Sequence, residues 1–280
     1  MNNQRERGAQ LHPRLSFFGF SKDIEAIASA GYDCIEMHMH EIMGMDQNAF
    51  SNLRVKLADS PIVCEVLDNP IPLDKVIADE SFDLDFYRAY LEKGAKRAAQ
   101  LGVKFYVFGN GRTRSLPVDG DIQAAKEKNL TFMRMLAEIA AGYNITVLIE
   151  PLAPRVSNVV QSIPEALDYI AEIGKPNLDT FLDYRWFVDR QHPYSMIMEY
   201  ADHIRHVHID NPSKPFPQRV IPRVDDGNDY SPFFDALQKI NYQAIISIEA
   251  NTFADFSQDL RDGLNFFKAY GLWDQSEKSG

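Results

Sequence analysis

Cysteine is scarce in this 280-residue sequence, which contains only Cys34 and Cys64. Each lies inside an apolar, strand-like run, where an unpaired thiol usually serves as a small hydrophobic side chain. A scaffold built on several disulfides is therefore excluded. A reducing, cytoplasmic location is the simplest expectation.

Long apolar runs are also missing. No uninterrupted apolar stretch approaches the roughly 20 residues that a membrane-spanning helix needs. The first residues, MNNQRERGAQLHPR, are polar and charged and lack the apolar region of a signal peptide. We expect a soluble protein with a polar extension over 1–14, one domain over 15–272 and a polar tail over 273–280.

Positive charge is in deficit. Forty acidic side chains face 29 basic ones, which gives a net charge of −11. No run of Lys and Arg offsets the repulsion that this charge imposes on a phosphate backbone. Neither nucleic acid nor a membrane is expected as a partner.

What the chain does contain is a repeated joint between a helical stretch and a strand-like run. A Gly or Asn ends the helical part, and Val, Ile and Phe follow it, in SAGYDCIEM, QLGVKFYVF, AAGYNITVLIE, EIGKPNLDTFLD and KINYQAIISIE. Gly and Asn suit the left-handed residue that ends a helix, and β-branched and aromatic residues suit a buried strand.

Three further apolar runs bring the number of candidate strands to eight. These strands are expected over 15–20, 33–39, 62–67, 103–109, 145–150, 178–183, 204–210 and 244–250, and helices over 21–30, 83–101, 121–141, 163–173 and 231–240. The even spacing, about thirty residues per unit, predicts a single closed (β/α)8 barrel. No Gly-rich dinucleotide motif follows an early strand, which disfavours a large open sheet.

Ligand-type side chains stand at the ends of the last four candidate strands. Strand alternation turns Glu150, Asp183, His208 and Glu249 toward the barrel axis. Catalytic groups of such barrels lie at this C-terminal end. Any one of these residues alone could be a strand-end carboxylate paired with a loop amide or a core histidine with a partner; their convergence indicates a functional cluster.

Three carboxylates and one imidazole would repel each other without a cation. A divalent ion removes that repulsion and keeps the carboxylates ionised. The oxygen-rich set has one nitrogen and no thiolate, which favours Mn²⁺ first, allows Mg²⁺ or Co²⁺ and disfavours a structural zinc.

The chain also resembles the xylose-isomerase-like TIM-barrel superfamily, in particular its sugar isomerase/epimerase branch related to ketose 3-epimerases and hydroxypyruvate isomerase. The resemblance is carried by IEMH at 35–38, GNGR at 109–112, VLIEPL at 147–152, FLDYRWF at 181–187, HIRHVHIDNP at 203–212, DYSPFFDAL at 229–237 and ISIEANTF at 247–253.

The resemblance implies that Glu150, Asp183, His208 and Glu249 hold the metal and that the two glutamates are the acid/base groups. The implied reaction is proton transfer on a sugar or sugar derivative through a metal-stabilised enediolate. Return of the proton to the same carbon inverts it, and return to the neighbouring carbon isomerises the sugar. A homo-oligomer is compatible with the resemblance, since relatives often form dimers or tetramers.

The substrate side departs from the family. Arg185 and Trp186 stand where many relatives carry a substrate-contacting His, Val156 replaces a Glu, and Lys214 replaces an Arg. Arg185, Trp186 and Lys214 are therefore candidate substrate contacts, and which sugar is bound stays open, including whether it is phosphorylated.

Two further residues are candidates for the substrate pocket. His38 lies at the end of the second strand, and Arg112 follows the fourth strand. A guanidinium in that turn could grip a carboxylate or phosphate, although a loop salt bridge explains Arg112 equally well.

Other functions stay open beside the isomerase/epimerase. A dehydratase or lyase acting on a keto-sugar, keto-inositol or keto-glycoside would use the same metal and glutamates. A non-catalytic sugar-binding subunit would keep only the barrel. A phosphodiesterase of the endonuclease-IV type fits poorly, because the chain has only seven histidines and no basic stripe.

Overall fold

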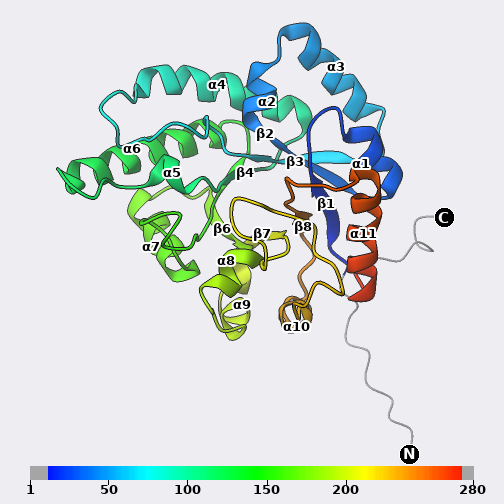
Figure 1. Cartoon of the computed structure of the whole chain (residues 1–280). Coiled ribbons are helices and arrows are strands. Elements are labelled where there is room, and N and C mark those ends of the chain that lie inside the picture. The colour runs from blue at the N-terminus through cyan, green and yellow to red at the C-terminus, as the bar shows by residue number, and fades with distance from the viewer. Residues whose placement is uncertain (1–11, 273–280) are drawn as a thin grey trace, which may run out of the picture.

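The computed structural model describes residues 12–272. Its eight parallel strands close into one barrel in sequence order, as predicted (Figure 1). The strands are β1 Arg14–Phe18, β2 Cys34–His38, β3 Val63–Asp68, β4 Phe105–Phe108, β5 Thr146–Ile149, β6 Leu178–Asp183, β7 Ile204–Ile209 and β8 Ile245–Ile248. Of the predicted terminal segments, 1–14 and 273–280, only residues 12–14 are described and the rest lie outside the described residues.

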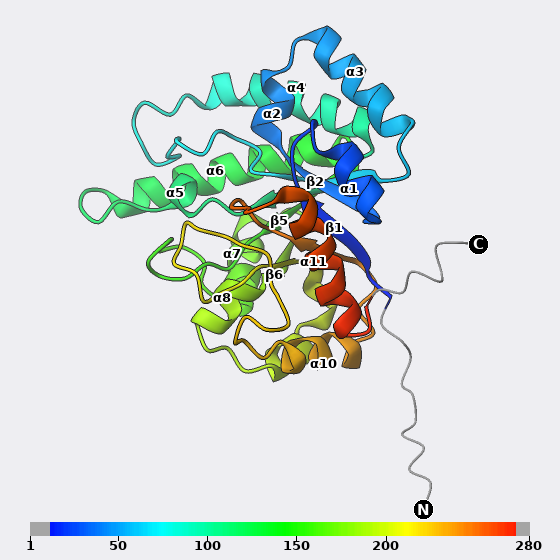
Figure 2. The ribbon, with the colours of Figure 1, turned by 45° about the vertical axis from the view of Figure 1, so that its right-hand side comes forward.

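Helices surround this barrel and cover its outer face (Figures 1 and 2). They are α1 Ile24–Ala30, α2 Met39–Gly44, α3 Gln47–Ala58, α4 Leu84–Leu101, α5 Gly111–Arg114, α6 Ile122–Ala141, α7 Ile163–Ile173, α8 Tyr184–Asp189, α9 Ser195–Glu199, the 3₁₀ helix η1 Ala201–His203, α10 Ser231–Lys239 and α11 Phe256–Ala269.

The ends of α7 show how local sequence sets a boundary. The side chain of Ser162 accepts a hydrogen bond from the backbone N–H of Glu165 at the N-terminus, which satisfies a donor that has no partner inside the helix. Gly174 ends the helix with a φ of 72°, a left-handed conformation that glycine adopts without a Cβ clash. The following chain then enters β6.

The strands carry two different apolar layers. Inside the barrel, one residue from each of six strands forms a compact cluster of Cys34, Val66, Val107, Leu148, Phe181 and Ile245. Their neighbours, such as Val147 and Ile149, belong instead to the large core shared with the helices. Because side chains alternate along a strand, the inward-facing residues at the C-terminal end of each strand lie at the mouth of the barrel. Both cysteines are buried and free, as predicted.

The connection from β7 to α10 is long and irregular, as its prolines indicate. It lies beside α8 in both ribbon views, drawn in yellow (Figures 1 and 2). Arg185 in α8 ties it down by donating to the carboxylate of Asp210 and, at 2.6 and 2.7 Å, to the carbonyls of Lys214 and Asn211. The loop is therefore anchored at its start rather than free.

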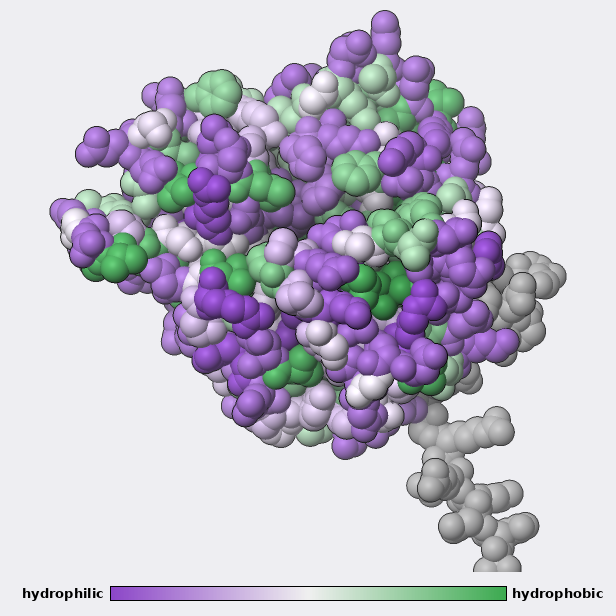
Figure 3. Space-filling view, in the orientation of Figure 1, coloured by the Kyte–Doolittle hydropathy of each residue, from purple (hydrophilic) through white to green (hydrophobic). Residues whose placement is uncertain are grey.

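The surface of the face seen in Figure 3 is largely hydrophilic, and its hydrophobic residues form small separate patches. No helix within 12–272 has both the length and the apolar character to cross a membrane.

Candidate active site

The predicted ligand residues come from four neighbouring strand ends. Asp183 is the last residue of β6 and His208 lies near the end of β7, and the two are register partners. Glu150 directly follows β5, and Glu249 directly follows β8. All four side chains therefore reach the C-terminal mouth of the barrel.

Three of them converge closely. Glu150, Asp183 and His208 are buried, and each offers a ligand atom within 4.8 Å of the others. Glu249 joins this group through His208, since its Oε2 lies 3.1 Å from the imidazole Nδ1. Asp183 has a second task, because its carboxylate accepts a hydrogen bond from the backbone N–H of Trp186 and so begins α8.

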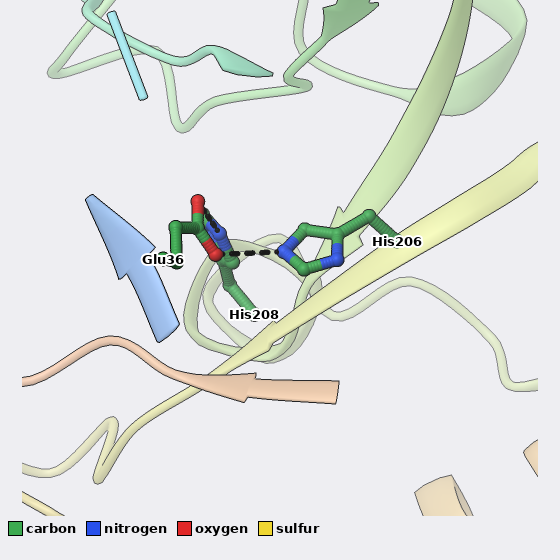
Figure 4. A group of neighbouring side chains, drawn as sticks. All are labelled: Glu36, His206 and His208. Atoms are coloured by element: carbon green, nitrogen blue, oxygen red, sulfur yellow. Dashed lines mark hydrogen bonds and ion pairs between the residues drawn. The ribbon is translucent and has the colours of Figure 1, made fainter. Parts of the chain in front are cut away.

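A second buried cluster lies just below, formed by Glu36 of β2 and the two histidines of β7 (Figure 4). Each oxygen of Glu36 lies 2.9 Å from one Nε2 atom, Oε2 from His206 and Oε1 from His208. Burial opposes ionisation of Glu36, but the positive charges of His208 and His206 outweigh it and lower its pKa. Hydrogen bonds thus account for this cluster without a metal.

Glu36 also determines which nitrogen of His208 faces the site. With Nε2 held by Glu36, the Nδ1 atom is directed toward Glu249. A carboxylate behind a histidine is the usual way to fix the ring and its tautomer at a metal. The sequence analysis included Glu36 only as part of the IEMH motif at 35–38 and did not predict this role.

The surroundings of Glu150 leave little room. A Cβ atom on Gly109 would overlap the Glu150 carboxylate, so the glycine is required for this close approach. The buried guanidinium of Arg114 donates to the backbone carbonyl of Glu150 from behind. Burial, followed by the charges of Asp183 and Glu249, raises the pKa of Glu150 well above its ordinary value.

Arg219 is a functional candidate that the sequence analysis missed. This buried side chain comes from the long loop and donates to Asp183 Oδ2 at 2.9 Å, while another of its nitrogens lies 3.0 Å from Glu249 Oε2. Its guanidinium also lies 5.4 Å from the ring centre of Trp186. It partly neutralises the carboxylates, and with His208 it outweighs burial to lower the pKa of Glu249.

The residues fit a divalent cation. Oε1 of Glu150 and Nδ1 of His208 are buried and make no hydrogen bond to any of residues 12–272; the 3.1 Å contact of this Nδ1 with Glu249 Oε2 lacks hydrogen-bond geometry. Buried polar atoms are normally satisfied, so two such atoms on converging side chains indicate an absent partner. Carboxylate oxygens with one imidazole nitrogen are suitable ligands for Mn²⁺, Mg²⁺ or Co²⁺.

A cavity of about 620 Å³ opens above this cluster. Glu150, His208, Arg219 and Glu249 form its floor. Its lining combines polar side chains, such as Asn69 and Asn110, with aromatic ones, such as Phe18 and Trp186. A volume of this size falls within the range of about 300–1,000 Å³ that is typical of small-molecule sites.

Among the predicted substrate contacts, the structure places His38, Arg112 and Trp186 at this cavity. His38 packs edge-on against Phe18, with ring centres 4.5 Å apart. The other two lie elsewhere. Arg185 is buried, and its guanidinium donates to Asp210 and to loop carbonyls. Lys214 has an exposed side chain on that loop.

Known proteins resemble this chain over part or all of its length. A ketose 3-epimerase of Arthrobacter globiformis is 27% identical over 147 residues, which make up 52% of this chain and 48% of the relative. An L-ribulose 3-epimerase of Methylomonas sp. is 25% identical over 139 residues, 49% of this chain and 44% of the relative. Each match thus spans about half of the relative's own length.

Solved structures match the whole barrel. A D-psicose 3-epimerase crystallised in the presence of D-fructose superposes with a TM-score of 0.76 at 18% identity, covering 93% of this chain and all of the other. A 3-keto-D-glucoside 4-epimerase from E. coli gives 0.76 at 17% identity, with 92% and 99% covered. At these identities the likeness shows the fold.

The family itself is defined by a match over most of the chain. The xylose isomerase-like TIM barrel family matches residues 24–270. This range contains strands β2 to β8 and the buried cluster of Glu150, Asp183 and His208. The chain belongs to the xylose isomerase-like TIM barrel family, and sugar 3-epimerases are among its distant homologues.

Proposed function

We propose that this protein is a divalent-metal-dependent isomerase or epimerase of a sugar or sugar derivative. The observation that carries the proposal is the buried cluster of Glu150, Asp183 and His208, of which Glu150 and His208 line the same cavity as Glu249. The named homologues act on sugars, which supports the same substrate class here.

The proposed metal ligands are Glu150, Asp183, His208 and Glu249, with Mn²⁺ as the preferred ion. A bound divalent ion would supply Lewis-acid polarisation of a substrate carbonyl, which makes the neighbouring C–H acidic. Glu36 would orient His208, and Arg219 would hold Asp183 and Glu249 in place.

Glu150 and Glu249 are the proposed proton carriers. They follow β5 and β8, so they approach the cavity from well-separated parts of the barrel wall. One carboxylate would remove a proton from the substrate, leaving an enediolate, and the other would return a proton. Return from the opposite face inverts a carbon, whereas return to the adjacent carbon interconverts an aldose and a ketose.

A lyase or dehydratase is the second candidate, favoured by the apolar part of the cavity. Val156 and Trp186 line it where the related epimerases carry Glu and His. The first proton removal would be the same, and the enediolate would then expel water or an aglycone. Release of such a group, with proton exchange preceding it, would distinguish this reaction from an isomerisation.

Solvent deuterium incorporation tests the proposal. Protein loaded with Mn²⁺ is incubated in D₂O with a panel of ketoses and keto-glycosides, and exchange is followed by NMR. We expect Glu150→Gln and Glu249→Gln to slow exchange at least about 100-fold, the usual contribution of a positioned acid or base.

The matched control is Glu65→Gln, another largely buried strand glutamate, which pairs with Arg14 and Lys104 away from the cavity. Its exchange rate should equal that of the wild type. Wild-type protein that exchanges no substrate proton, or glutamine variants that exchange as fast as wild type, would refute the proposed mechanism.

A further inference from the structure

The cavity has a rim that a free sugar does not explain. Three large apolar side chains line the cavity and are nevertheless exposed, Phe20 by 39%, Leu73 by 42% and Phe216 by 46%. They come from three separate segments, after β1, after β3 and within the long loop. Apolar side chains gathered around the mouth of a pocket mark a surface that a ligand covers.

The apolar surface continues from the rim into the cavity. Phe216 packs against Trp186 with ring centres 5.3 Å apart, and Trp186 clusters with Leu152, Ala153 and Val156. This wall faces the same space as Glu150 and Glu249. A single ligand can therefore contact both the proposed metal site and the apolar wall.

Polar groups line the cavity as well. Asp68 ends β3, Asn69 and Asn110 follow β3 and β4, and Asn251 follows β8. These carboxylate and amide groups suit hydroxyls, which both donate and accept hydrogen bonds. The cavity thus offers polar groups to a sugar ring and apolar surface to an apolar substituent.

The volume of the cavity agrees with a ligand larger than a single sugar. About 620 Å³ is in the range of pockets that enclose drug-sized ligands, well beyond the needs of one hexose. One hexose offers a small C–H face that can stack on a single aromatic ring, so it leaves the other rim side chains exposed to water.

We propose that the substrate is a sugar derivative bearing an apolar or aromatic substituent, such as a glycoside with an aromatic aglycone. The sugar ring lies over the proposed metal site, and the substituent packs between Phe20, Leu73 and Phe216. This inference rests on the proposed function and names its substrate class.

Calorimetric titration of the Mn²⁺-loaded protein tests this with matched pairs of probes, methyl and phenyl β-D-glucopyranoside and methyl and phenyl β-D-galactopyranoside. Phenyl adds apolar surface worth more than about 1.4 kcal/mol when buried, so at least one phenyl glycoside should bind at least tenfold more tightly than its methyl partner. Its binding should also have the more negative heat-capacity change.

Variants locate the effect. In Phe216→Ala and Phe20→Ala the ratio of phenyl to methyl glycoside affinity should fall to about threefold or less. Phe86→Ala is the matched control, because Phe86 on α4 is 59% exposed and packs on Tyr87 away from the cavity. It should keep the full preference.

The inference is overturned if neither phenyl glycoside binds more tightly than its methyl partner, if none of the four probes binds, or if the rim variants keep the preference. This outcome is distinct from failure of the proposed function. Absence of deuterium exchange with phenyl preference intact would remove the isomerase chemistry and leave the ligand class standing.

Discussion

His208 illustrates how one side chain connects two buried clusters. Its Nε2 atom is 2.9 Å from Glu36 Oε1 and its Nδ1 atom is 3.1 Å from Glu249 Oε2. Burial would lower the pKa of this imidazole, but the carboxylates of Glu36 and Glu249 outweigh burial and raise it well above its ordinary value. A cation beside Nδ1 would replace the proton that these carboxylates favour.

Glu36→Gln should therefore weaken Mn²⁺ binding about 10–100-fold. A side-chain amide has only one oxygen, so it cannot accept a hydrogen bond from each of the two histidine rings through a separate oxygen. Calorimetric titration of metal-free protein with Mn²⁺ measures the change. Glu65→Gln, on the neighbouring strand β3, serves as the control and should bind Mn²⁺ as wild type does. Equal Mn²⁺ affinity in Glu36→Gln and wild type would show that the carboxylate has no such role.

Arg219 is the second residue whose role depends on charge. It contacts Asp183 and Glu249, two carboxylates that a divalent ion would also neutralise. Removing a buried cation from such a pair usually costs about 3–5 kcal/mol, because the carboxylates stay behind uncompensated.

We expect Arg219→Gln to melt at a lower temperature than wild type without metal, and to gain more from Mn²⁺ than wild type does. Thermal melts with and without Mn²⁺ provide the comparison. A metal-induced shift of the same size in both proteins would mean that Arg219 and the metal do not act on the same charges.

Sequence analysis could not have found Arg219. It lies in an irregular stretch with several prolines, where no periodicity relates a residue number to a direction in space. The strand residues Glu150, Asp183 and His208 were predictable because alternation along a β-strand fixes the face of every side chain. Arg185 was a candidate substrate contact because of its place after Asp183, whereas in the structure its donors bind Asp210 and the loop.

At the scale of elements, the turn from β4 to α5 determines where Glu150 can lie. Gly109 follows β4 and faces the Glu150 carboxylate so closely that a methyl group would displace it. We expect Gly109→Ala to weaken Mn²⁺ binding and slow proton exchange at least about tenfold, as a misplacement near 1 Å commonly does.

Gly44→Ala is the matched control, since nothing lies within 4 Å of the added methyl group at the end of α2. Both variants should keep the circular-dichroism spectrum of the wild type. If Gly109→Ala binds Mn²⁺ and exchanges protons as the wild type does, Glu150 does not need this position.

All eight strands and several helices were predicted, whereas the long helices α3 and α11 and several short helices were missed. All eight predicted strands and the helices α1, α4, α6, α7 and α10 lie within a few residues of their expected positions. The helices α2, α5 and α8 have only six, four and six residues, too few for an amphipathic pattern to appear. α8 begins at Asp183, so one carboxylate supplies both a cap and a ligand atom.

At the scale of the whole molecule, the two ends of the barrel have different tasks. The C-terminal mouth carries carboxylates that Arg219 neutralises only in part, whereas at the other end Glu65 pairs with Arg14 at 2.5 Å and with Lys104 at 2.7 Å. Residues at the N-terminal end of the barrel thus serve stability and those at the C-terminal end serve chemistry, which is the common division in this architecture.

The Glu65 contacts predict how stability depends on pH. The hydrogen bond from Arg14 is the largest cause that lowers the pKa of Glu65 below its ordinary value of 4.5. A lowered folded-state pKa contributes stability that is present above about 4.5 and is lost as the pH falls through the folded-state value.

Glu65→Gln should reduce the free energy of unfolding at pH 7 by no more than about 1 kcal/mol, because Arg14 and Lys104 are partly exposed to solvent. The difference should shrink as the pH falls below 4.5. Urea unfolding at pH 7 and at progressively lower pH gives both values. A difference that stays constant with pH would exclude an ionic contribution.

The proposed function requires a divalent ion held between Glu150, Asp183, His208 and Glu249. Its most direct test is a titration of metal-free protein with Mn²⁺, with free Mn²⁺ measured by electron paramagnetic resonance. We predict one tight site per chain in wild type and at least tenfold weaker binding in His208→Ala and Asp183→Asn. Wild type that binds no Mn²⁺, or ligand variants that bind it as tightly as wild type, would contradict the metal centre.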